Sequence, residues 1–217
     1  ILSELTVPVA FATVCDVMEL TGENRIVVAK GLKKAKECNI PGVRALLAAY
    51  ELEDKDLTAY HAGFLLGPCF NAAGRLDTAL LGLELLLCEE EEEAGKRASY
   101  LKELNDVRKQ MTQTATEQAI LLAEEKLMKE ERQVLVLYLP ECHESLAGIV
   151  AGRVREHFYR PTIILTKGEH CVKGSGRSIE GYSMFEKLSE QKDLFSAFGG
   201  HPMAAGMSLE EENVPIL

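Results

Sequence analysis

The sequence predicts an α/β protein in which a helical first part and a long helix precede a domain with a mixed sheet. Three observations support this fold class. Residues 1–88 alternate short apolar runs with threonines and prolines that can begin helices. Residues 90–130 contain no proline and are rich in Glu, Lys, Gln, Leu and Ala, which is typical of a long amphipathic helix. After Arg132, two short β-rich runs flank a segment of helical periodicity.

Residues 1–88 are expected to form a run of short helices. Residues suited to begin a helix are Thr6 with Pro8, Thr21, Pro41, Thr58 and Asp77. The segment GPCFNAAGR (67–75), between the last two helices, is too rich in Gly, Pro and Asn to be helical throughout. We therefore expect a loop there.

The residues after Arg132 are expected to form a βαβ unit. Residues 133–139 and 162–166 have the composition of buried strands, and residues 145–158 between them have helical spacing. This order implies a partly parallel sheet. Residues 170–178 add a glycine-rich extended segment, and residues 197–209 a tight turn into a short strand.

Composition and cysteine spacing indicate a soluble protein of a reducing cytoplasm. Apolar residues make up 47% and charged residues 27%, and the apolar stretches 7–17 and 79–88 are too short to span a bilayer. The six cysteines are scattered without a CxxC pair, which disfavours a disulfide framework or a zinc site. Because the chain begins with Ile1 rather than Met, we expect a piece of a longer polypeptide.

The formal net charge of −10 argues against a diffuse nucleic-acid-binding surface. Residues 131–217 hold 9 Lys and Arg against 12 Asp and Glu, and Glu89 to Glu93 form an acidic run. No basic stripe of the kind that drives non-specific DNA binding is visible. Any contact with nucleic acid must therefore be local, made in a cleft by a few arginines.

Two polar segments of the first 88 residues could carry chemistry. Asp16 stands inside an apolar run, so burial would require a cation or strong donors around it. It is either a capped or ion-paired aspartate or a ligand for Mg²⁺ or Mn²⁺. Asn71 and Arg75 are expected in the glycine-rich loop, where the arginine could bind a phosphate or pair with Asp77 on the surface.

Two glycine-rich segments and one histidine stand out in the second part. In GSGRS (174–178), Ser175 and Arg177 offer donors to a phosphodiester, or the segment is a plain β-turn. In FGGHPMAAG (198–206), His201 could donate to a phosphate or be a structural residue. His143 precedes an expected helix start, where free amides favour an anion.

The order of these segments along the chain is specific. They are, in order, TVCDVMELTGENR, GPCFNAAGRLDTA, CHESLAGIVAGRV with YRPTIIL, GSGRSI and FGGHPMAAG. Together they resemble the RecJ exonucleases of the DHH phosphoesterase superfamily from about residue 9 to residue 208. The turn GGHPMAAG resembles the signature of the DHH-associated domain. The resemblance implies the C-terminal part of a DHH domain (1–88), a long linking helix (89–130) and a DHH-associated substrate-binding domain (131–217).

The resemblance also implies roles for individual residues. Asp16 matches the last metal-ligand aspartate of the DHH domain, and Arg75 with Asn71 matches a loop that faces the scissile phosphate. Ser175, Arg177 and His201 match positions that bind the DNA backbone, and His143 matches a family histidine of the same domain. Asp16, Arg75 and His201 are thus the candidate catalytic residues. We expect Arg75, Arg177 and His201 to line one groove with Asp16 at its rim.

The implied activity is 5′-to-3′ release of mononucleotides from single-stranded DNA, in DNA repair and recombination, by hydrolysis at two Mn²⁺ or Mg²⁺ ions. This sequence contains no Asp-His-His, and no Asp-x-Asp lies upstream of Asp16. Because two-metal hydrolysis needs several such ligands, the isolated chain is expected to be inactive and not to retain the ions. Single-stranded DNA is the implied partner, and a helicase or a single-strand-binding protein is a further one; no membrane partner is expected.

Two other functions stay open. The parent protein could be a DHH phosphodiesterase that acts on short oligonucleotides or cyclic dinucleotides. It could also be a nucleic-acid-binding scaffold that has lost catalysis. The length of the preferred substrate distinguishes the first alternative from an exonuclease. The presence or replacement of the upstream metal ligands distinguishes the second.

Overall fold

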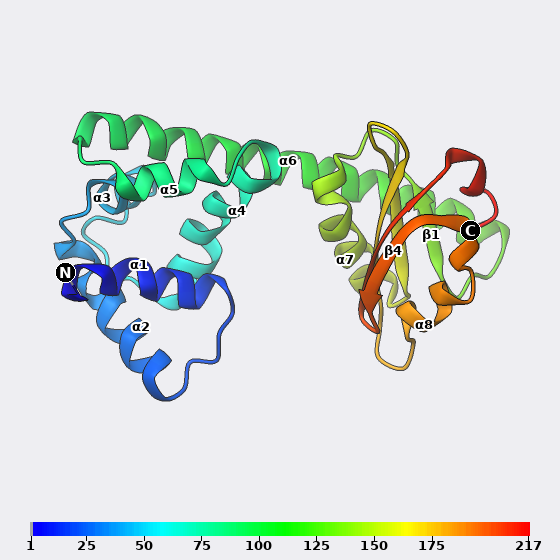
Figure 1. Cartoon of the computed structure of the whole chain (residues 1–217), viewed down its shortest axis with the longest axis horizontal. Coiled ribbons are helices and arrows are strands. Elements are labelled where there is room, and N and C mark those ends of the chain that lie inside the picture. Colours follow the sequence, from blue (N-terminus) through cyan, green and yellow to red (C-terminus); the bar gives the residue numbers. More distant parts are fainter. Residues whose placement is uncertain (1) are drawn as a thin grey trace. The chain divides into compact units, whose positions relative to one another are not determined.

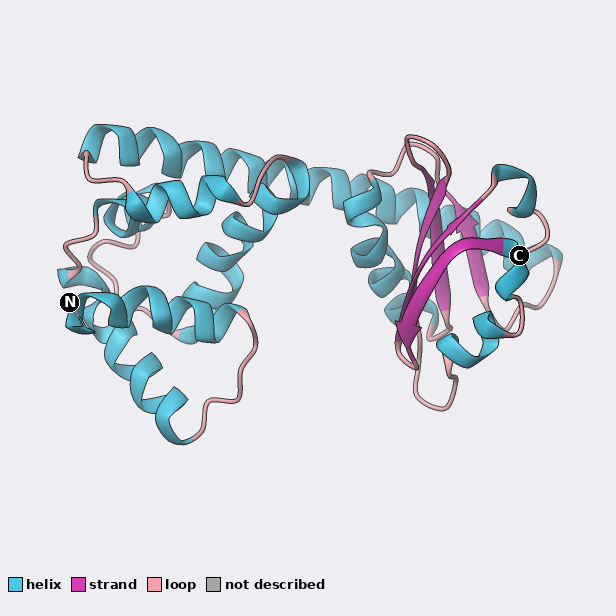
Figure 2. Cartoon of the chain, viewed as in Figure 1, coloured by secondary structure: helices cyan, strands magenta, loops and turns pink. Residues whose placement is uncertain are grey.

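The computed structural model describes residues 2–217, with side chains from residue 5 onward, and divides into two compact units, Ile1–Arg108 and Lys109–Leu217. The first unit is helical, and the second contains a five-stranded mixed sheet (Figures 1 and 2). The predicted fold class, including the long helix, is therefore confirmed. The domain boundaries expected after residues 88 and 130 stay a prediction.

The first unit is a bundle of short helices around a core of buried Leu, Val, Ala and Phe side chains. Its helices are α1 (Leu2–Cys15), α2 (Gly22–Lys34), the 3-10 turn η1 (Ala35–Glu37), α3 (Pro41–Ala49), the π-helical segment η2 (His61–Leu66), α4 (Gly67–Leu76), α5 (Leu80–Leu87) and the first part of α6 (Glu91–Lys129).

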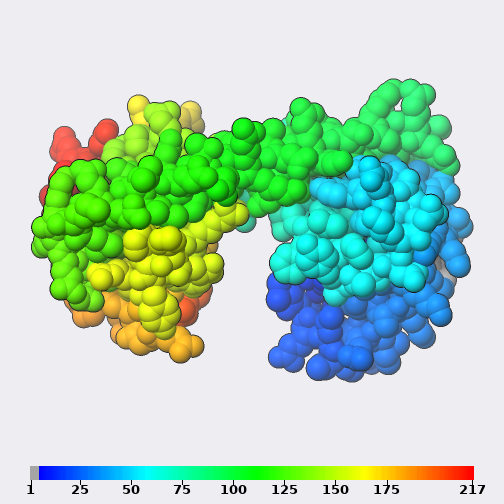
Figure 3. Space-filling model, turned by 180° about the vertical axis from the view of Figure 1, so that it is seen from behind, coloured from blue at the N-terminus to red at the C-terminus, as the bar shows by residue number. Residues whose placement is uncertain are grey.

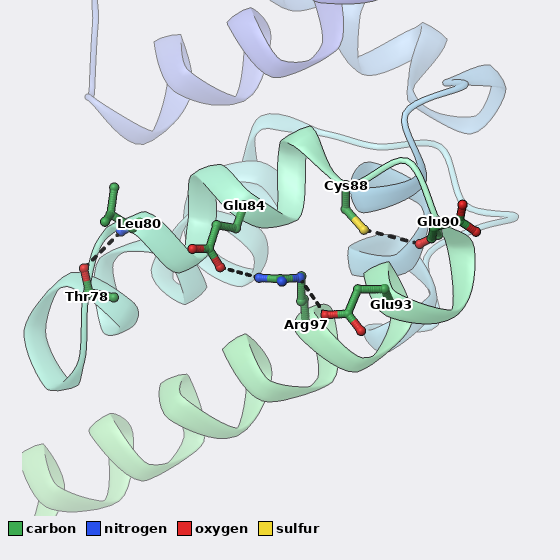
Figure 4. Close-up of polar contacts among 7 residues, drawn as sticks. All are labelled: Thr78, Leu80, Glu84, Cys88, Glu90, Glu93 and Arg97. Carbon is green, nitrogen blue, oxygen red and sulfur yellow. Dashed lines mark hydrogen bonds and ion pairs between the residues drawn. The ribbon is translucent and has the colours of Figure 1, made fainter.

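The predicted helix starts are partly confirmed. Thr21 is the N-cap residue of α2, although its side chain makes no capping hydrogen bond, and Pro41 opens α3. The prediction for α1 is wrong, because this helix begins at Leu2 and contains Pro8. Burial of the apolar face of α1 offsets the backbone hydrogen bond that proline removes. The prediction for Asp77 is also wrong. The amide of Leu80, at the start of α5, donates instead to Thr78 Oγ1 at 3.3 Å (Figure 4).

Polar contacts join the start of α6 to α5. The guanidinium of Arg97 binds the carboxylate of Glu84 on α5 and that of Glu93 one turn earlier on α6, the latter at 2.9 Å (Figure 4). In the connection between the two helices, Cys88 Sγ donates to the carbonyl of Glu90 at 3.3 Å. The acidic run is therefore partly neutralised by an arginine of the same unit.

The second unit is built on a sheet with strand order β1-β2-β3-β5-β4. Strands β1 and β2 are parallel, and the other neighbouring pairs are antiparallel. The predicted βαβ unit is thus confirmed. The elements are β1 (Leu135–Tyr138), the 3-10 turn η3 (Glu144–Leu146), α7 (Ala147–Phe158), β2 (Thr162–Lys167), β3 (Val172–Arg177), α8 (Met184–Ser189), the 3-10 turn η4 (Lys192–Leu194), β4 (Phe195–His201), β5 (Ala204–Leu209) and the 3-10 turn η5 (Glu211–Asn213).

The two faces of this sheet differ. On one face, α7 and the second part of α6 cover β1 and β2, with Val150, Val154 and Ile164 in the core. On the other face, α8 packs over β3, and a Cβ at Gly176 would lie 2.2 Å from Met184 Sδ. We call the first the α7 face and the second the α8 face. Because side chains alternate along a strand, Lys173, Ser175 and Arg177 share the α7 face.

The second part of α6 runs along the surface of the second unit (green in Figure 3). Ala115, Ala119 and Ala123 are buried against the core, whereas Leu121 and Met128 are exposed. Within residues 2–217, no helix combines the length and the apolar character that crossing a bilayer requires.

Candidate nucleic-acid interface

Arg177 is held on the α7 face by hydrogen bonds within its own strand. Its Nη1 atom donates to Ser175 Oγ at 3.0 Å and to the carbonyl of Gly176 at 2.7 Å. Ser175 and Arg177 are two residues apart on β3 and both are half-buried. A guanidinium held in this way has lost part of its rotamer freedom before a ligand binds, which lowers the entropic cost of binding.

The first turn of α7 lies directly against this arginine. A Cβ atom at Gly148 would lie 2.6 Å from Arg177 Nη2 and 2.9 Å from Ser175 Oγ. Only a glycine therefore lets the guanidinium and the hydroxyl approach the helix this closely. The sequence prediction missed Gly148, and we add it to the candidate site.

The glycines of GSGRS have a structural role. The segment lies within β3, so the alternative of a plain β-turn is wrong. A Cβ at Gly174 would lie 2.7 Å from Met207 Cγ, and one at Gly176 would meet Met184. The missing side chains of these glycines leave room for methionine side chains on the α8 face, while Ser175 and Arg177 point to the α7 face.

His201 stands at the end of β4, in the row of residues that contains Arg177. The register pairs His201 with Ala204 on β5, and Ala204 with Arg177 on β3. Arg177 and His201 are therefore two strands apart on one face, with Cα atoms about 10 Å apart at the usual strand spacing. The amide of Met203 donates to His201 Nδ1 at 3.3 Å, so Nε2 carries the ring proton in the neutral form.

His143 has the same tautomer for the same reason. It is the N-cap residue of η3, and its Nδ1 accepts from the amide of Ser145 at 3.3 Å and lies 2.8 Å from Ser145 Oγ. Its Nε2–H group is thus available as a donor. His143 lines a pocket of about 520 Å³ together with Lys167 and Lys173, two lysines that the sequence prediction did not name.

Between Ser175 and the edge strand β4, the α7 face carries two glycines in place of side chains. Gly206 pairs with Ser175 on β3 and with Gly199 on β4. Both glycines are exposed, and a Cβ at either would have no atom within 4 Å. Glycines inside strands often mark places where a ligand or another backbone approaches closely.

In the first unit, the structure corrects the surroundings of Asn71 and Arg75. Both are exposed residues of α4, so the expected loop is wrong. Proline in the first turn is compatible with a helix, and Ala72 and Ala73 give α4 a buried face. Asn71 and Arg75 are four residues apart and share one side of this helix. The carboxylate of Asp77, which the sequence offered as a surface partner for Arg75, accepts a hydrogen bond from the hydroxyl of Tyr100 at 2.8 Å.

Asp16 lies just after the end of α1 and is exposed, contrary to the burial expected from its apolar neighbours. Its amide donates to the carbonyl of Ala12 at 2.9 Å, and Val17 then leaves the helix with a φ of 55°. The preceding Cys15 packs against α4, since a Cβ at Gly67 would lie 2.3 Å from its Sγ. Asp16 therefore lies beside the start of α4.

The described residues do not fit a two-metal centre. From residue 2 to residue 217, no group of three or more His, Cys, Asp or Glu side chains is arranged to hold an ion. Asp16 could supply only one ligand. The expected groove containing Arg75, Arg177 and His201 joins residues of both units and stays a prediction.

One comparison with known proteins concerns the second unit alone. Residues 131–217 match the model of the DHHA1 domain. This segment contains all four candidate residues of the second unit that were predicted from the sequence, namely His143, Ser175, Arg177 and His201.

The whole chain is similar to RecJ. It is 43% identical to the single-stranded-DNA-specific exonuclease RecJ of Salmonella typhimurium, over 97% of this chain and 38% of that protein. It is 36% identical to RecJ of Bacillus subtilis, over 96% of this chain and 26% of that protein. The predicted resemblance is confirmed, and the chain spans about two fifths or less of these curated relatives.

Solved structures agree with this result. The crystal structure of RecJ with Mn²⁺ from Thermus thermophilus superposes with a TM-score of 0.84 at 32% identity, over 99% of this chain and 31% of that one. A crystal structure of exonuclease RecJ bound to manganese gives a TM-score of 0.88 at 32% identity, over 99% of this chain and 52% of that one.

Proposed function

We propose that this chain is the strand-binding part of an exonuclease that digests single-stranded DNA from 5′ to 3′ and releases mononucleotides. The observation that carries the proposal is the arrangement of Ser175, Arg177 and His201 on the α7 face of the sheet. Their donors all belong to a segment that matches the DHHA1 domain, in a chain similar to RecJ over nearly its whole length.

The chemistry of this face suits a phosphodiester backbone. A guanidinium supplies several N–H donors in one plane and neutralises phosphate charge. The imidazole of His201 supplies an Nε2–H donor from the edge strand β4, two strands from Arg177. Because the donors are fixed by contacts within the protein, a strand that binds there is held in register. A net charge of −10 is compatible with this binding, since a few close donors dominate over a distant, screened field.

Catalysis requires residues beyond those of this chain. We propose that Asp16 is one ligand of the Mn²⁺ or Mg²⁺ used by the parent protein and that Arg75, with Asn71, faces the scissile phosphate. One exposed carboxylate does not form a metal site, so the isolated chain should bind DNA without cutting it.

The cellular role of the parent protein is part of the same proposal. The parent would act in the cytoplasm, in DNA repair and recombination, on strands opened by a helicase or held by a single-strand-binding protein. No membrane partner is proposed. The partner of this chain itself is single-stranded DNA.

The test is a binding titration of the 217-residue chain with fluorescent oligothymidylate and with a duplex of equal length. We expect binding of the single strand, much weaker binding of the duplex, and no cleavage with Mn²⁺. Arg177→Ala should weaken single-strand binding roughly tenfold to a hundredfold, as expected for loss of a charged hydrogen-bonding group. Arg132→Ala, which removes an exposed arginine paired with Glu130, is the matched control and should leave affinity unchanged.

Equal affinity of the wild-type chain and the Arg177→Ala variant would contradict the proposed interface. In the parent protein, a preference for dinucleotides over long strands would instead favour a phosphodiesterase of short oligonucleotides. Binding without any cleavage by the complete parent would favour a scaffold.

A further inference from the structure

The pocket of about 520 Å³ lies where the parallel strands β1 and β2 end. Residues from the loop after β1 and from the β2–β3 turn form its walls, and Lys173 at the start of β3 also lines it. Crevices at the carboxyl ends of parallel strands are a common position for ligands in α/β proteins. The proposed role of Arg177 does not use this pocket.

Lys173 links the pocket to the face that carries Arg177. It alternates with Ser175 and Arg177 along β3, so all three side chains project to the α7 face. Its Nζ atom donates to Ser208 Oγ at 3.1 Å, and Ser208 is its register partner on β5. This bond positions the ammonium group and leaves it two further N–H donors.

The spacing of the two cations suits a polymer better than a single phosphate. Lys173 and Arg177 are four residues apart on one strand, which is about 13 Å at the usual rise per residue. The Nζ atom of Lys173 is held at Ser208 and Nη1 of Arg177 at Ser175, so the two cationic groups are fixed at separate points along β3. His143 Nε2–H, at the wall of the same pocket, adds a further donor on the side of Lys173.

We propose that Lys173 and His143 form a second phosphate-binding subsite, so that a single strand runs along β3 from Arg177 to the pocket. This inference rests on the proposed function and extends it, because it assigns the path of the strand and a minimum length of ligand. A strand with one phosphate occupies the position at Arg177, and longer strands also reach Lys173.

Three carboxylates in the pocket reduce the positive charge of the proposed subsite. Glu141, Glu144 and Glu169 also line the pocket and are exposed, and Glu169 lies 3.9 Å from the imidazole of His170. The pocket alone is therefore not expected to bind free anions. A phosphate gains from it only when the contact at Arg177 already holds the strand in place, as expected for linked contacts with a raised effective concentration.

The experiment compares two ligands that differ in phosphate number. Thymidylyl-thymidine, which has one phosphate, is titrated by NMR, and an eight-residue oligothymidylate by fluorescence anisotropy over a series of salt concentrations. Lys173→Ala should weaken binding of the eight-residue strand about tenfold, with little effect on the dinucleotide. The slope of log K against log salt should fall by about 0.7, the value for one lost contact to a single strand.

Control variants make the result specific. Lys173→Arg should retain the affinity for the long strand, because it keeps the charge. Lys187→Ala removes a lysine from α8, on the other face of the sheet, and should leave both ligands unaffected. Arg177→Ala should weaken both ligands. Thermal melting of each variant establishes that the fold is retained.

The possible outcomes separate this inference from the proposed function. If Arg177→Ala weakens both ligands and Lys173→Ala weakens neither, the second subsite is refuted and the proposed function stands. If Lys173→Ala weakens the dinucleotide as much as the long strand, the assigned path is wrong. If neither variant changes binding, the interface itself is refuted.

Discussion

A Cβ atom at Gly148 would lie 2.6 Å from Nη2 of Arg177, so the first turn of α7 and the guanidinium occupy positions that only glycine permits. These residues are 29 positions apart in the sequence. This close approach joins α7 and β3 at the proposed DNA-binding face. The arginine has a defined place before any ligand arrives.

Gly148→Ala should displace the Arg177 guanidinium without unfolding the chain. The end of an arginine side chain can move, and alanine favours a helix over glycine by about 1 kcal/mol. We therefore expect unchanged or higher thermal stability together with roughly tenfold weaker binding of oligothymidylate. Gly152→Ala, in the same helix at a position with no atom within 4 Å, is the control and should bind normally. Equal binding by both variants would contradict the role of Gly148.

Glycines on the two faces of the sheet should respond oppositely to substitution. Gly176→Ala places a methyl group against Met184 Sδ and should destabilise the second unit by about 1–3 kcal/mol. Gly206→Ala adds a methyl group in open space on the α7 face and should stabilise the strand by about 0.5–1 kcal/mol. Urea unfolding measures both changes. In the double variant, Met184→Ala should relieve part of the destabilisation caused by Gly176→Ala. If the losses of unfolding free energy of the two single variants simply add, the contact between positions 176 and 184 is not the cause.

Asp16→Asn should have no effect on this chain and a large effect in the parent protein. Asp16 is exposed, so its replacement should change stability by less than about 0.5 kcal/mol and leave strand binding intact. If Asp16 is a metal ligand in the parent, the same change should abolish Mn²⁺-dependent cleavage there. Glu19→Gln, in the same exposed loop, is the control. Full activity of the Asp16 variant of the parent would exclude the proposed ligand role.

Tyr50 should make the stability of the first unit depend on pH in the alkaline range. Burial, together with the hydrogen bond to Cys69, raises the pKa of its hydroxyl. A phenol with a raised folded-state pKa contributes stability that is complete below its unfolded pKa of about 10 and is lost as the pH rises above it. Unfolding free energies at several pH values between 8 and 11 should therefore fall more steeply for the wild-type chain than for Tyr50→Phe. Parallel curves would contradict the assignment.

Periodicity predicted much of the fold, because apolar residues at strand or helix spacing form a buried face. The strand-helix-strand order after Arg132 is an example. Composition misled the prediction for α4, where glycine and proline suggested a loop. Pro68 is harmless in the first turn, and Gly67 is required by the close approach of Cys15.

The candidate site was predictable where its residues follow one pattern along one element. Ser175 and Arg177 were named from the sequence, and the two-residue spacing of β3 could have added Lys173. Gly148 could not be found in this way, because its role arises from a contact between α7 and β3. Asp16 was expected to be buried, but α1 ends beside it and leaves it exposed.

The central claim is that a single strand of DNA binds the α7 face of the sheet. It is tested most directly by an NMR titration of the isotope-labelled chain with an eight-residue oligothymidylate. Amide shifts should concentrate at Ser175, Arg177 and Gly206, while those of Phe185 and Leu188 on α8 should not change. Shifts that concentrate on α8, or none at saturating DNA, would contradict it.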